Sequence, residues 1–269
     1  MQQVMSGEKV EDLYFIQKVK LGQGAFGTVW RAVNRETQVP AAMKQLDKRT
    51  MPSRNVRKED IEREVRMMKA CNHVNITQCF HFFEDARYLY LALEYCDGGD
   101  FGDKVKERGM NLKEREAAEW VGQICESIAH LHCHKICHRD IKPDNFMVAG
   151  DVLKLSDFGL ALVLKGGRML TEKCGTPAFM APEQHKLPRQ SKGYSFPVDM
   201  WAAGVSMYML MFGGKHPFVS DSGNLDEKTM LKGTLDFRVK TGFFGFGNGA
   251  PRFSEEARAL CQAMVQADP

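Results

Sequence analysis

The segment from His138 to Asn145, His-Arg-Asp-Ile-Lys-Pro-Asp-Asn, gathers several side chains that can do chemistry. Asp140 offers a carboxylate that can accept a hydroxyl proton, and Lys142 stands two residues after it. Asn145 offers an amide oxygen for a metal ion. Twelve residues after it, Asp157 begins the triplet Asp-Phe-Gly. These residue types predict a carboxylate that can act as a general base, close in sequence to an amide oxygen that can bind a metal ion.

A glycine-rich run lies near the beginning of the chain. Gly22, Gly24 and Gly27 follow the pattern G-x-G-x-x-G-x-V. Dinucleotide-binding folds share this spacing, but there the glycines open a helix. Here they precede Thr28-Val29-Trp30, which favours a strand. A strand-turn-strand flap of this kind lets the backbone lie close over phosphates. The lack of alternating strands and helices also disfavours a dinucleotide-dependent enzyme.

A lysine and a glutamate form the next candidate pair. Lys44 ends the apolar strand Ala41-Ala42-Met43. Glu64, twenty residues later, shares a helix face with Ile61 and Met68 and can turn inward. A buried lysine needs a carboxylate partner to keep its charge. We therefore expect a Lys44–Glu64 ion pair that presents an ammonium group to an anionic ligand.

Two kinds of secondary structure position these residues. Residues 14–46 and 76–95 contain short β-prone runs separated by glycine-rich or charged turns, which predicts an antiparallel sheet. Residues 58–70 have helical periodicity. From Asp97 onward helices dominate, with a change of character around residues 94–99. Helices are expected near 111–131, with Asn111 as N-cap, at 199–211, and at 254–265, with Ser254 as N-cap.

Composition excludes several classes of protein. Hydrophobic residues make up 43% of the 269 residues and charged residues 26%, as in globular proteins. The 37 basic and 34 acidic residues give a net charge too small to indicate nucleic-acid binding. No apolar run is long enough for a membrane span, and no leader precedes the first charged residues, so we expect a cytoplasmic protein. The eight cysteines are expected to be reduced, and the run from His130 to His138 lacks zinc-finger spacing.

The ordered set of motifs, closed by Ala181-Pro182-Glu183, resembles a eukaryotic protein kinase catalytic domain. The resemblance covers about residues 14–269, with residues 1–13 as an N-terminal extension. It implies an α+β, two-lobed fold: a small antiparallel β-sheet N-lobe with one key helix (about 14–95), a hinge (about 94–99) and a larger, mainly helical C-lobe (about 97–269). That family continues into a further helix, so the domain is expected to be truncated before it.

The resemblance also assigns roles. Asp140, Lys142 and Lys44 are expected to be catalytic, and Asn145 and Asp157 to hold Mg²⁺. The residues expected to bind ATP are Leu21, Gly22, Gly24, Gly27, Val29, Ala42, Lys44, Glu64, Leu93, Glu94, Cys96 and Met147.

The same resemblance implies transfer of the γ-phosphate of MgATP to serine or threonine. Thr176, in Gly-Thr-Pro, is expected to contact Asp140 and Lys142 and to take part in substrate recognition. Asp100 and Asp144 match acidic positions that recognise an arginine upstream of the phosphorylated residue. Met209 stands where strongly arginine-selective kinases carry glutamate, so we expect moderate basophilicity.

Regulation is expected in the segment between Asp157 and Glu183. Arg139 normally grips a phosphate on this loop. Glu172 occupies the position often phosphorylated in related kinases, so we hypothesise that its carboxylate partly replaces the phosphate. The competing hypothesis makes Thr171 the regulatory site.

Asn145-Phe146-Met147 and Cys174-Gly175-Thr176-Pro177 most resemble the calcium/calmodulin-dependent and calcium-dependent protein kinases. No EF-hand spacing is present, so a calcium-sensing or other regulatory domain is expected outside these residues. Two rival functions remain: a pseudokinase scaffold that binds nucleotide without turnover, and a kinase of small molecules. The first predicts loss of Lys44, Asp140 or Asp157, and the second predicts no peptide-docking loop.

Overall fold

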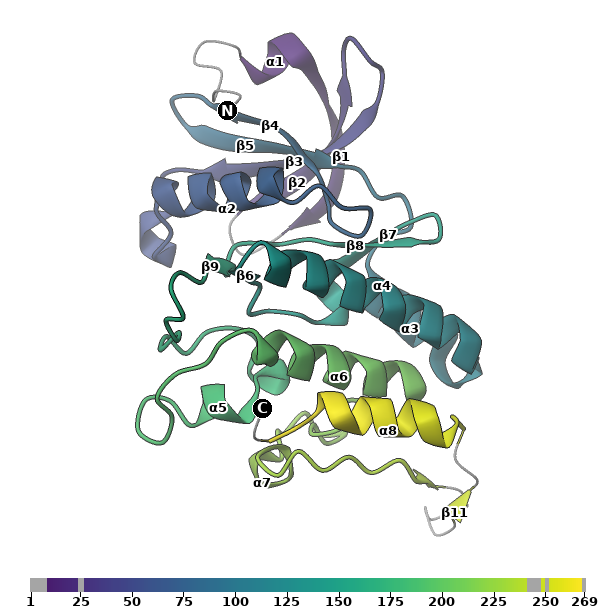
Figure 1. The fold of residues 1–269 in the computed structure, drawn as a ribbon. Coiled ribbons are helices and arrows are strands. Elements are labelled where there is room, and N and C mark those ends of the chain that lie inside the picture. The colour runs from purple at the N-terminus through teal and green to yellow at the C-terminus, as the bar shows by residue number, and fades with distance from the viewer. Residues whose placement is uncertain (1–8, 24–26, 241–247, 250–251, 268–269) are drawn as a thin grey trace. The chain divides into compact units, whose positions relative to one another are not determined.

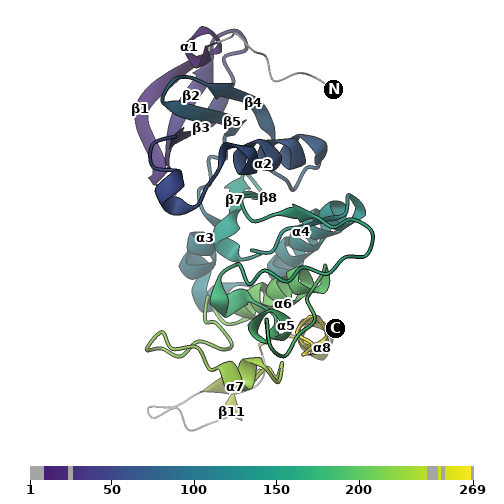
Figure 2. The ribbon, with the colours of Figure 1, turned by 90° about the vertical axis from the view of Figure 1, so that its left-hand side faces the viewer.

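The computed structural model describes residues 9–23, 27–240, 248–249 and 252–267, and the chain forms two compact units (Figure 1). The first unit comprises residues 1–99 and 148–159, and the second comprises residues 100–147 and 160–269. An antiparallel sheet dominates the first unit, and helices dominate the second (Figure 2). This is the two-lobed α+β fold expected from the sequence.

The sheet of the first unit has five strands in the order β1-β2-β3-β5-β4, all paired antiparallel. Sequential neighbours pair through short turns, as expected for β-prone runs separated by glycine or charged residues. The predicted strands are confirmed. They are β1 (Tyr14–Gln23), β2 (Thr28–Asn34), β3 (Pro40–Asp47), β4 (Cys79–Glu84) and β5 (Tyr88–Glu94).

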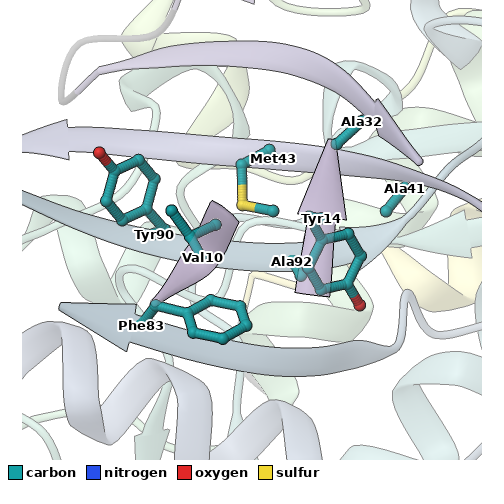
Figure 3. Packing of buried hydrophobic residues seen from close by; sticks show 8 residues of the cluster. All are labelled: Val10, Tyr14, Ala32, Ala41, Met43, Phe83, Tyr90 and Ala92. Atoms are coloured by element: carbon teal, nitrogen blue, oxygen red, sulfur yellow. The ribbon is translucent and has the colours of Figure 1, made fainter. Parts of the chain in front are cut away.

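One face of this sheet carries the hydrophobic core of the first unit (Figure 3). Met43 and Ala92 lie opposite each other in the register of β3 and β5, and neither is exposed to solvent. The short helix α1 (Val10–Leu13) adds Val10 to the same cluster. Because side chains alternate along a strand, Ala42 and Lys44 must lie on the opposite face.

Helix α2 (Lys58–Ala70) has the bounds predicted from its periodicity. Asp60 accepts a hydrogen bond from the backbone N–H of Arg57, which satisfies one of the free amides before the helix. Ile61, Val65 and Met68 are buried, as the 4-then-3 spacing requires. Glu64 lies on the same buried side, with 2% of its surface exposed.

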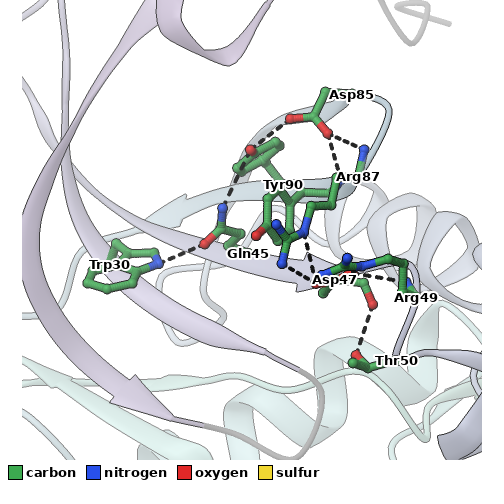
Figure 4. A network of polar contacts seen from close by, with 9 residues as sticks. Trp30, Gln45, Asp47, Arg49, Thr50, Asp85, Arg87 and Tyr90 are labelled. Atoms are coloured by element: carbon green, nitrogen blue, oxygen red, sulfur yellow. Dashed lines mark hydrogen bonds and ion pairs between the residues drawn. The ribbon is translucent and has the colours of Figure 1, made fainter.

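A chain of polar contacts ties three strands of the sheet together (Figure 4). The indole Nε1 of Trp30 donates to Oε1 of Gln45 at 2.9 Å, and Nε2 of Gln45 donates to the Tyr90 hydroxyl at 3.5 Å. That hydroxyl donates to Asp85 in the turn between β4 and β5. The network fixes the side chain of Gln45, whose backbone faces the glycine-rich turn.

The hairpin of β7 (Phe146–Ala149) and β8 (Val152–Leu155) joins the first unit from residue 148 onward. The predicted apolar strand 152–155 is confirmed. The side chain of Asn75 donates to the backbone oxygen of Leu153, and the amide of Thr77 donates to that of Leu155. These bonds fix the strand two residues before Asp157.

The second unit is built around three long helices. Helix α6 (Pro197–Met211) packs against α4 (Glu114–Cys133) and α8 (Glu255–Met264), and Figure 1 shows the three side by side. The shorter helices and strands of this unit are α3 (Phe101–Arg108), α5 (Pro182–His185), α7 (Glu227–Met230), β6 (Ile136–Cys137), β9 (Leu162–Val163), β10 (Val239–Lys240) and β11 (Asn248–Gly249). Single 3-10 turns are η1 (Pro52–Arg54) in the first unit and η2 (Gly109–Asn111), η3 (Pro143–Asn145) and η4 (Pro177–Phe179) in the second.

One predicted cap is wrong and another is confirmed. Asn111 ends the turn η2, and α4 begins after Lys113 without a side-chain cap. The expected partner, Glu114, instead accepts hydrogen bonds from the amide and hydroxyl of Ser254. Ser254 is the N-cap of α8 and accepts from the amide of Ala257, as predicted. Glu114 therefore bonds to Ser254, which is distant in the sequence, and does not form the predicted capping box with Asn111.

Helix α6 is buried on almost all sides, which explains its lack of a polar face. Pro197 stands at its first position, where a missing N–H costs nothing. Among the described residues, no helix combines the length and the apolar character needed to cross a membrane.

Candidate active site

The ion pair predicted between Lys44 and Glu64 is present in the first unit. Nζ of Lys44 lies 2.9 Å from Oε1 of Glu64 and 3.9 Å from Oδ1 of Asp157. Strand β3 supplies the lysine, α2 the glutamate, and the segment after β8 the aspartate. Only 3% of the Glu64 side chain is exposed, compared with 51% for Asp157. Asp157 is therefore the carboxylate that remains accessible to a ligand.

The charge of Lys44 is secured by these two carboxylates. Burial lowers the pKa of the ammonium, but Glu64 and Asp157 outweigh it and hold the pKa above its ordinary value. Lys44 is therefore protonated throughout the physiological range. A largely buried ammonium next to the half-exposed Asp157 is suited to holding an anion such as a phosphate.

The glycine-rich turn lies close to β3. A side chain at Gly27 would place its Cβ only 2.0 Å from the backbone oxygen of Gln45, so this position admits glycine alone. Gly22 pairs in register with Val29, and a Cβ there would meet nothing within 4 Å. Gly24 lies outside the described residues. The two described glycines thus differ: one is required by packing, and the other leaves open space.

Several residues expected to contact adenine share the sheet face of Lys44. In the register, Val29 lies opposite Lys44, and Ala42 lies opposite Leu93. Directly opposed residues of an antiparallel pair project to the same face. This face therefore places small or apolar side chains beside the Lys44 ammonium, and Arg31, opposite Ala42, lies on the same face. Leu21, at the end of β1, is 39% exposed, and Met147 belongs to the second unit.

The side chains of the predicted hinge are engaged within the first unit. Oε1 of Glu94 lies 2.7 Å from Nζ of Lys154, and Oε2 accepts from the amide of Gln78. Cys96 is buried, and burial raises the pKa of its thiol to about 11. At Glu94 and Cys96, therefore, the main-chain atoms rather than the side chains are what the segment can offer to a ligand.

In the second unit, Asp140 lies at the centre of a dense set of hydrogen bonds. Nζ of Lys142 donates to Oδ2 at 2.9 Å, and the amide of Asn145 donates to the same oxygen at 2.9 Å. The backbone N–H and hydroxyl of Thr176 donate to Oδ1 at 2.9 and 2.7 Å. The predicted contacts of Thr176 with Asp140 and Lys142 are confirmed.

These bonds keep the Asp140 carboxylate ionised. Burial raises its pKa, but hydrogen bonds from Lys142 and Thr176 outweigh it and hold the pKa below the ordinary value. The Thr176 hydroxyl also shows that Oδ1 can accept from an alcohol at 2.7 Å, the distance a general base requires. The arrangement can orient an alcohol and accept its proton.

Asp199 positions this loop, although the sequence reasoning missed it. Its carboxylate accepts hydrogen bonds from the backbone amides of His138 and Arg139 at 2.9 and 2.8 Å and lies 2.9 Å from Nε2 of His132. Asp199 is 1% exposed, and despite burial its hydrogen bonds keep its pKa below the ordinary value. The sequence does hint at this role: Asp199 lies inside the apolar run 197–211, and a carboxylate buried in such a run needs hydrogen-bond donors.

Arg139 contacts the predicted regulatory segment. Its Nη1 lies 3.2 Å from Oε2 of Glu172 and 3.3 Å from the hydroxyl of Tyr194. The Arg139 side chain is 4% exposed and that of Glu172 is 71% exposed. Thr171, the competing candidate, is exposed on the same segment.

Asp100 and Asp144 come together beside Gly102. Asp100 caps α3, accepting from the amide of Asp103. A Cβ built at Gly102 would lie 3.0 Å from Oδ1 of Asp100 and 3.4 Å from Oδ1 of Asp144. Burial, followed by the charge of Asp144, raises the pKa of Asp100. Two crowded carboxylates favour a cation between or above them.

The oxygen donors fit a magnesium ion by their chemistry. Asp157 offers a half-exposed carboxylate. Asn145 donates from its amide nitrogen to the backbone oxygen and to Oδ2 of Asp140, and its amide oxygen is the atom that could contribute to a metal site. Carboxylate and amide oxygens are hard ligands of the kind Mg²⁺ prefers.

Comparison with known proteins decides the family. The profile of the protein kinase domain matches residues 15–269. The chain belongs to the protein kinase family. It is 33% identical over 273 residues to a probable myosin light chain kinase of Dictyostelium discoideum, an alignment covering 100% of this chain and 73% of that protein.

Other relatives of this kinase domain are serine/threonine kinases. Calcium-dependent protein kinase 10 of Arabidopsis thaliana is 34% identical over 266 residues, which cover 97% of this chain and 46% of the relative. A mouse serine/threonine-protein kinase is 35% identical over 266 residues, which cover 97% of this chain and 31% of that protein. The chain thus spans about half the length, or less, of several curated relatives that it matches.

Proposed function

We propose that this kinase domain transfers the γ-phosphate of MgATP to serine and threonine side chains of proteins. The observation that carries the proposal is the Asp140 carboxylate, ionised and already accepting from the Thr176 hydroxyl at 2.7 Å. A substrate hydroxyl needs the same geometry. Its oxygen forms the new bond to the γ-phosphorus, the bond between that phosphorus and the ADP oxygen breaks, and the hydroxyl proton passes to Asp140.

The other residues divide the remaining tasks. Lys44, fixed by Glu64 at 2.9 Å, pairs with phosphate oxygens, while Gly22 and Gly27 let the backbone cover them. Lys142 lies beside the base and supplies positive charge near the transferred group. Asp157 and Asn145 would hold Mg²⁺, which neutralises charge on the phosphates when bound.

The decisive experiment is transfer of radiolabelled phosphate to a serine peptide array by wild type and Asp140→Asn. We expect incorporation by wild type and a loss of at least about a hundredfold in the variant, because general-base catalysis contributes about 10²–10⁴-fold. Asp151→Asn, a change at an exposed aspartate between β7 and β8, is the matched control. Equal incorporation by wild type and Asp140→Asn would refute the assignment of the base. Nucleotide binding without incorporation by wild type would favour the pseudokinase scaffold.

We propose moderate preference for an arginine upstream of the phosphorylated residue. The adjacent carboxylates of Asp100 and Asp144 support it, because a guanidinium can bind both at once. An arginine scan of the best peptide tests it. The upstream arginine should improve kcat/KM in wild type, and the gain should disappear in Asp100→Asn/Asp144→Asn. An unchanged gain would assign recognition to other residues.

We also propose that Glu172 partly replaces a loop phosphate, supported by its 3.2 Å contact with the buried Arg139 guanidinium. The Glu172 carboxylate carries less charge than a phosphate, so its interaction with Arg139 is weaker. Protein from a bacterial host, treated with phosphatase, should therefore be active, and Glu172→Gln should be less active. An inert preparation rescued only by phosphate on Thr171 contradicts the proposal.

Regulation by calcium is proposed for the longer protein that would contain this domain. Two relatives, 34% and 33% identical to this chain, are calcium-dependent protein kinases, which supports the proposal. Phosphorylation by the full protein should then rise on addition of calcium and fall with a chelator, while the isolated domain should be insensitive. Equal sensitivity of the two proteins would refute an external calcium sensor.

A further inference from the structure

Tyr194 connects the predicted regulatory segment to the loop that carries Asp140. The residue is 1% exposed. Its hydroxyl donates to the backbone oxygen of Glu172 at 2.8 Å and accepts from Nη1 of Arg139 at 3.3 Å. Sγ of Cys174 lies 3.5 Å from the same hydroxyl. One buried hydroxyl therefore contacts two positions of the segment and the residue directly before Asp140.

The backbone beside Tyr194 makes a second connection. The amide of Leu170 donates to the oxygen of Tyr194, and the amide of Tyr194 donates to the oxygen of Leu170, both at 2.8 Å. Gly193 has φ +134°, and a Cβ there would lie 2.8 Å from the oxygen of Leu170. The close approach of the two chains depends on glycine at this position.

Arg139 is held from several directions in this network. Its Nε donates to the backbone oxygen of Leu160 at 2.6 Å, and its own amide donates to Asp199. Its ion pair with Glu172 involves a carboxylate side chain that is 71% exposed. Exposed ion pairs contribute little, whereas a buried hydrogen bond leaves an unsatisfied group when it is broken. The Tyr194 hydroxyl is thus the stronger of the two links between Arg139 and the segment.

We propose that Tyr194 is a positioning residue that holds residues 170–174 against Arg139 without phosphorylation. The segment leads directly to Thr176, which bonds to Asp140, so its position determines the geometry at the base. This inference rests on the proposed function for its kinetic consequence, but the structural role is measurable in an inactive protein. The proposal also means that Tyr194, and not only the charge of Glu172, keeps residues 170–174 in place.

The structural test is hydrogen–deuterium exchange of the amides in residues 170–176 in wild type and Tyr194→Phe. The variant keeps the ring and removes only the hydroxyl, so we expect exchange in this segment to be about tenfold faster. Tyr208→Phe is the matched control. Tyr208 is also buried, and its hydroxyl donates to the backbone oxygen of Asp236 at 2.7 Å.

The kinetic test uses the same variants. Tyr194→Phe should raise KM for the peptide about three- to tenfold and leave KM for ATP unchanged, and Tyr208→Phe should do neither. Unchanged exchange in Tyr194→Phe, or equal acceleration by both variants, would overturn the role of Tyr194. If wild type phosphorylates no peptide, the proposed function fails, and the exchange measurement still decides the role of Tyr194.

Discussion

Lys44 and Asp140 keep their charges inside partly buried surroundings because each has compensating partners. Lys44 has two carboxylates within 4 Å, at 2.9 and 3.9 Å. Asp140 has donors from Lys142, Asn145 and Thr176. Removing a partner should therefore change the charge state or the orientation of the group that remains.

Glu64→Gln tests the role of the carboxylate partners of Lys44. The variant loses a charge-assisted hydrogen bond worth about 1.5–3 kcal/mol, so we expect the affinity for a non-hydrolysable ATP analogue to fall about ten- to a hundredfold. Isothermal titration calorimetry measures it. Glu62→Gln, two residues earlier on α2 and partly exposed, should bind as wild type does. Equal affinities of the two variants would show that the Lys44–Glu64 pair does not organise the nucleotide site.

The pH dependence of the reaction tests the role of the hydrogen-bond donors around Asp140. The pKa of Asp140 lies below its ordinary value of 3.8, so the base stays ionised as pH falls toward that value. Because its folded pKa is lowered, the Asp140 carboxylate stabilises the folded protein at pH values above its unfolded pKa. This stabilisation is lost as the pH falls through the lower folded pKa. We expect log kcat/KM to show no acid limb from Asp140 at pH values above about 4.

Lys142→Met should move that acid limb to higher pH, because the variant removes a donor that lowers the pKa of Asp140. Lys165→Met, a change at an exposed lysine of the same unit, should leave the limb where it is. A limb at the same pH in wild type and Lys142→Met would show that another group controls the acid side of the profile.

At the scale of single elements, close contacts between neighbouring elements decide where side chains fit. The glycine-rich turn rests on the backbone of β3, and α8 begins with a cap that also bonds to α4. Both features connect segments that are far apart in the chain or on different strands. Two substitutions examine them separately.

Gly27→Ala should disturb the β2–β3 pairing, since its Cβ would lie 2.0 Å from the oxygen of Gln45. Overpacking of this kind costs about 1–3 kcal/mol, or about 2–12 °C in Tm for a chain of this length. Gly22→Ala, where a Cβ meets nothing within 4 Å, should melt as wild type does. Thermal melts with equal Tm for the two variants would contradict the close approach at Gly27.

Ser254→Ala should destabilise the second unit, because Ser254 caps α8 and also donates to Glu114. Loss of such a cap costs about 0.5–2 kcal/mol. Asn111→Ala, at the cap predicted from the sequence, should cost almost nothing, because α4 begins at Glu114 without a side-chain cap. Urea denaturation measures both. A larger loss of unfolding free energy in Asn111→Ala than in Ser254→Ala would show that Asn111 does cap α4.

For the whole molecule, nucleotide binding should appear as stabilisation that depends on the metal. An ATP analogue at about a hundred times its Kd should stabilise the protein by about 2.7 kcal/mol, which corresponds to about 5–11 °C in Tm. We expect this shift with Mg²⁺, a smaller one with a chelator, and no magnesium-dependent part in Asp157→Asn. Asp151→Asn should behave as wild type. A shift independent of magnesium in wild type would remove Asp157 from metal binding.

Much of the fold and of the site follows from local sequence. Helix α2 has its predicted bounds because apolar spacing alone selects its buried face, and Glu64 follows from that spacing. Asp140, Lys142 and Asn145 lie within six consecutive residues, so a tight loop brings them together wherever the rest of the chain goes. The pairings β1–β2, β2–β3 and β4–β5 follow from β-prone runs joined by short connections, whereas the pairing of β3 with β5 spans α2 and β4 and does not.

Tertiary structure decided the contacts whose partners are distant in the chain. Asp199 accepts from an amide 60 residues earlier, Tyr194 reaches Arg139 across 55 residues, and Ser254 takes Glu114 away from the predicted cap across 140 residues. No local pattern specifies such partners, because a buried carboxylate or hydroxyl needs a donor or acceptor but does not encode which one. Tertiary packing makes that choice, since it fixes which polar groups lie next to one another.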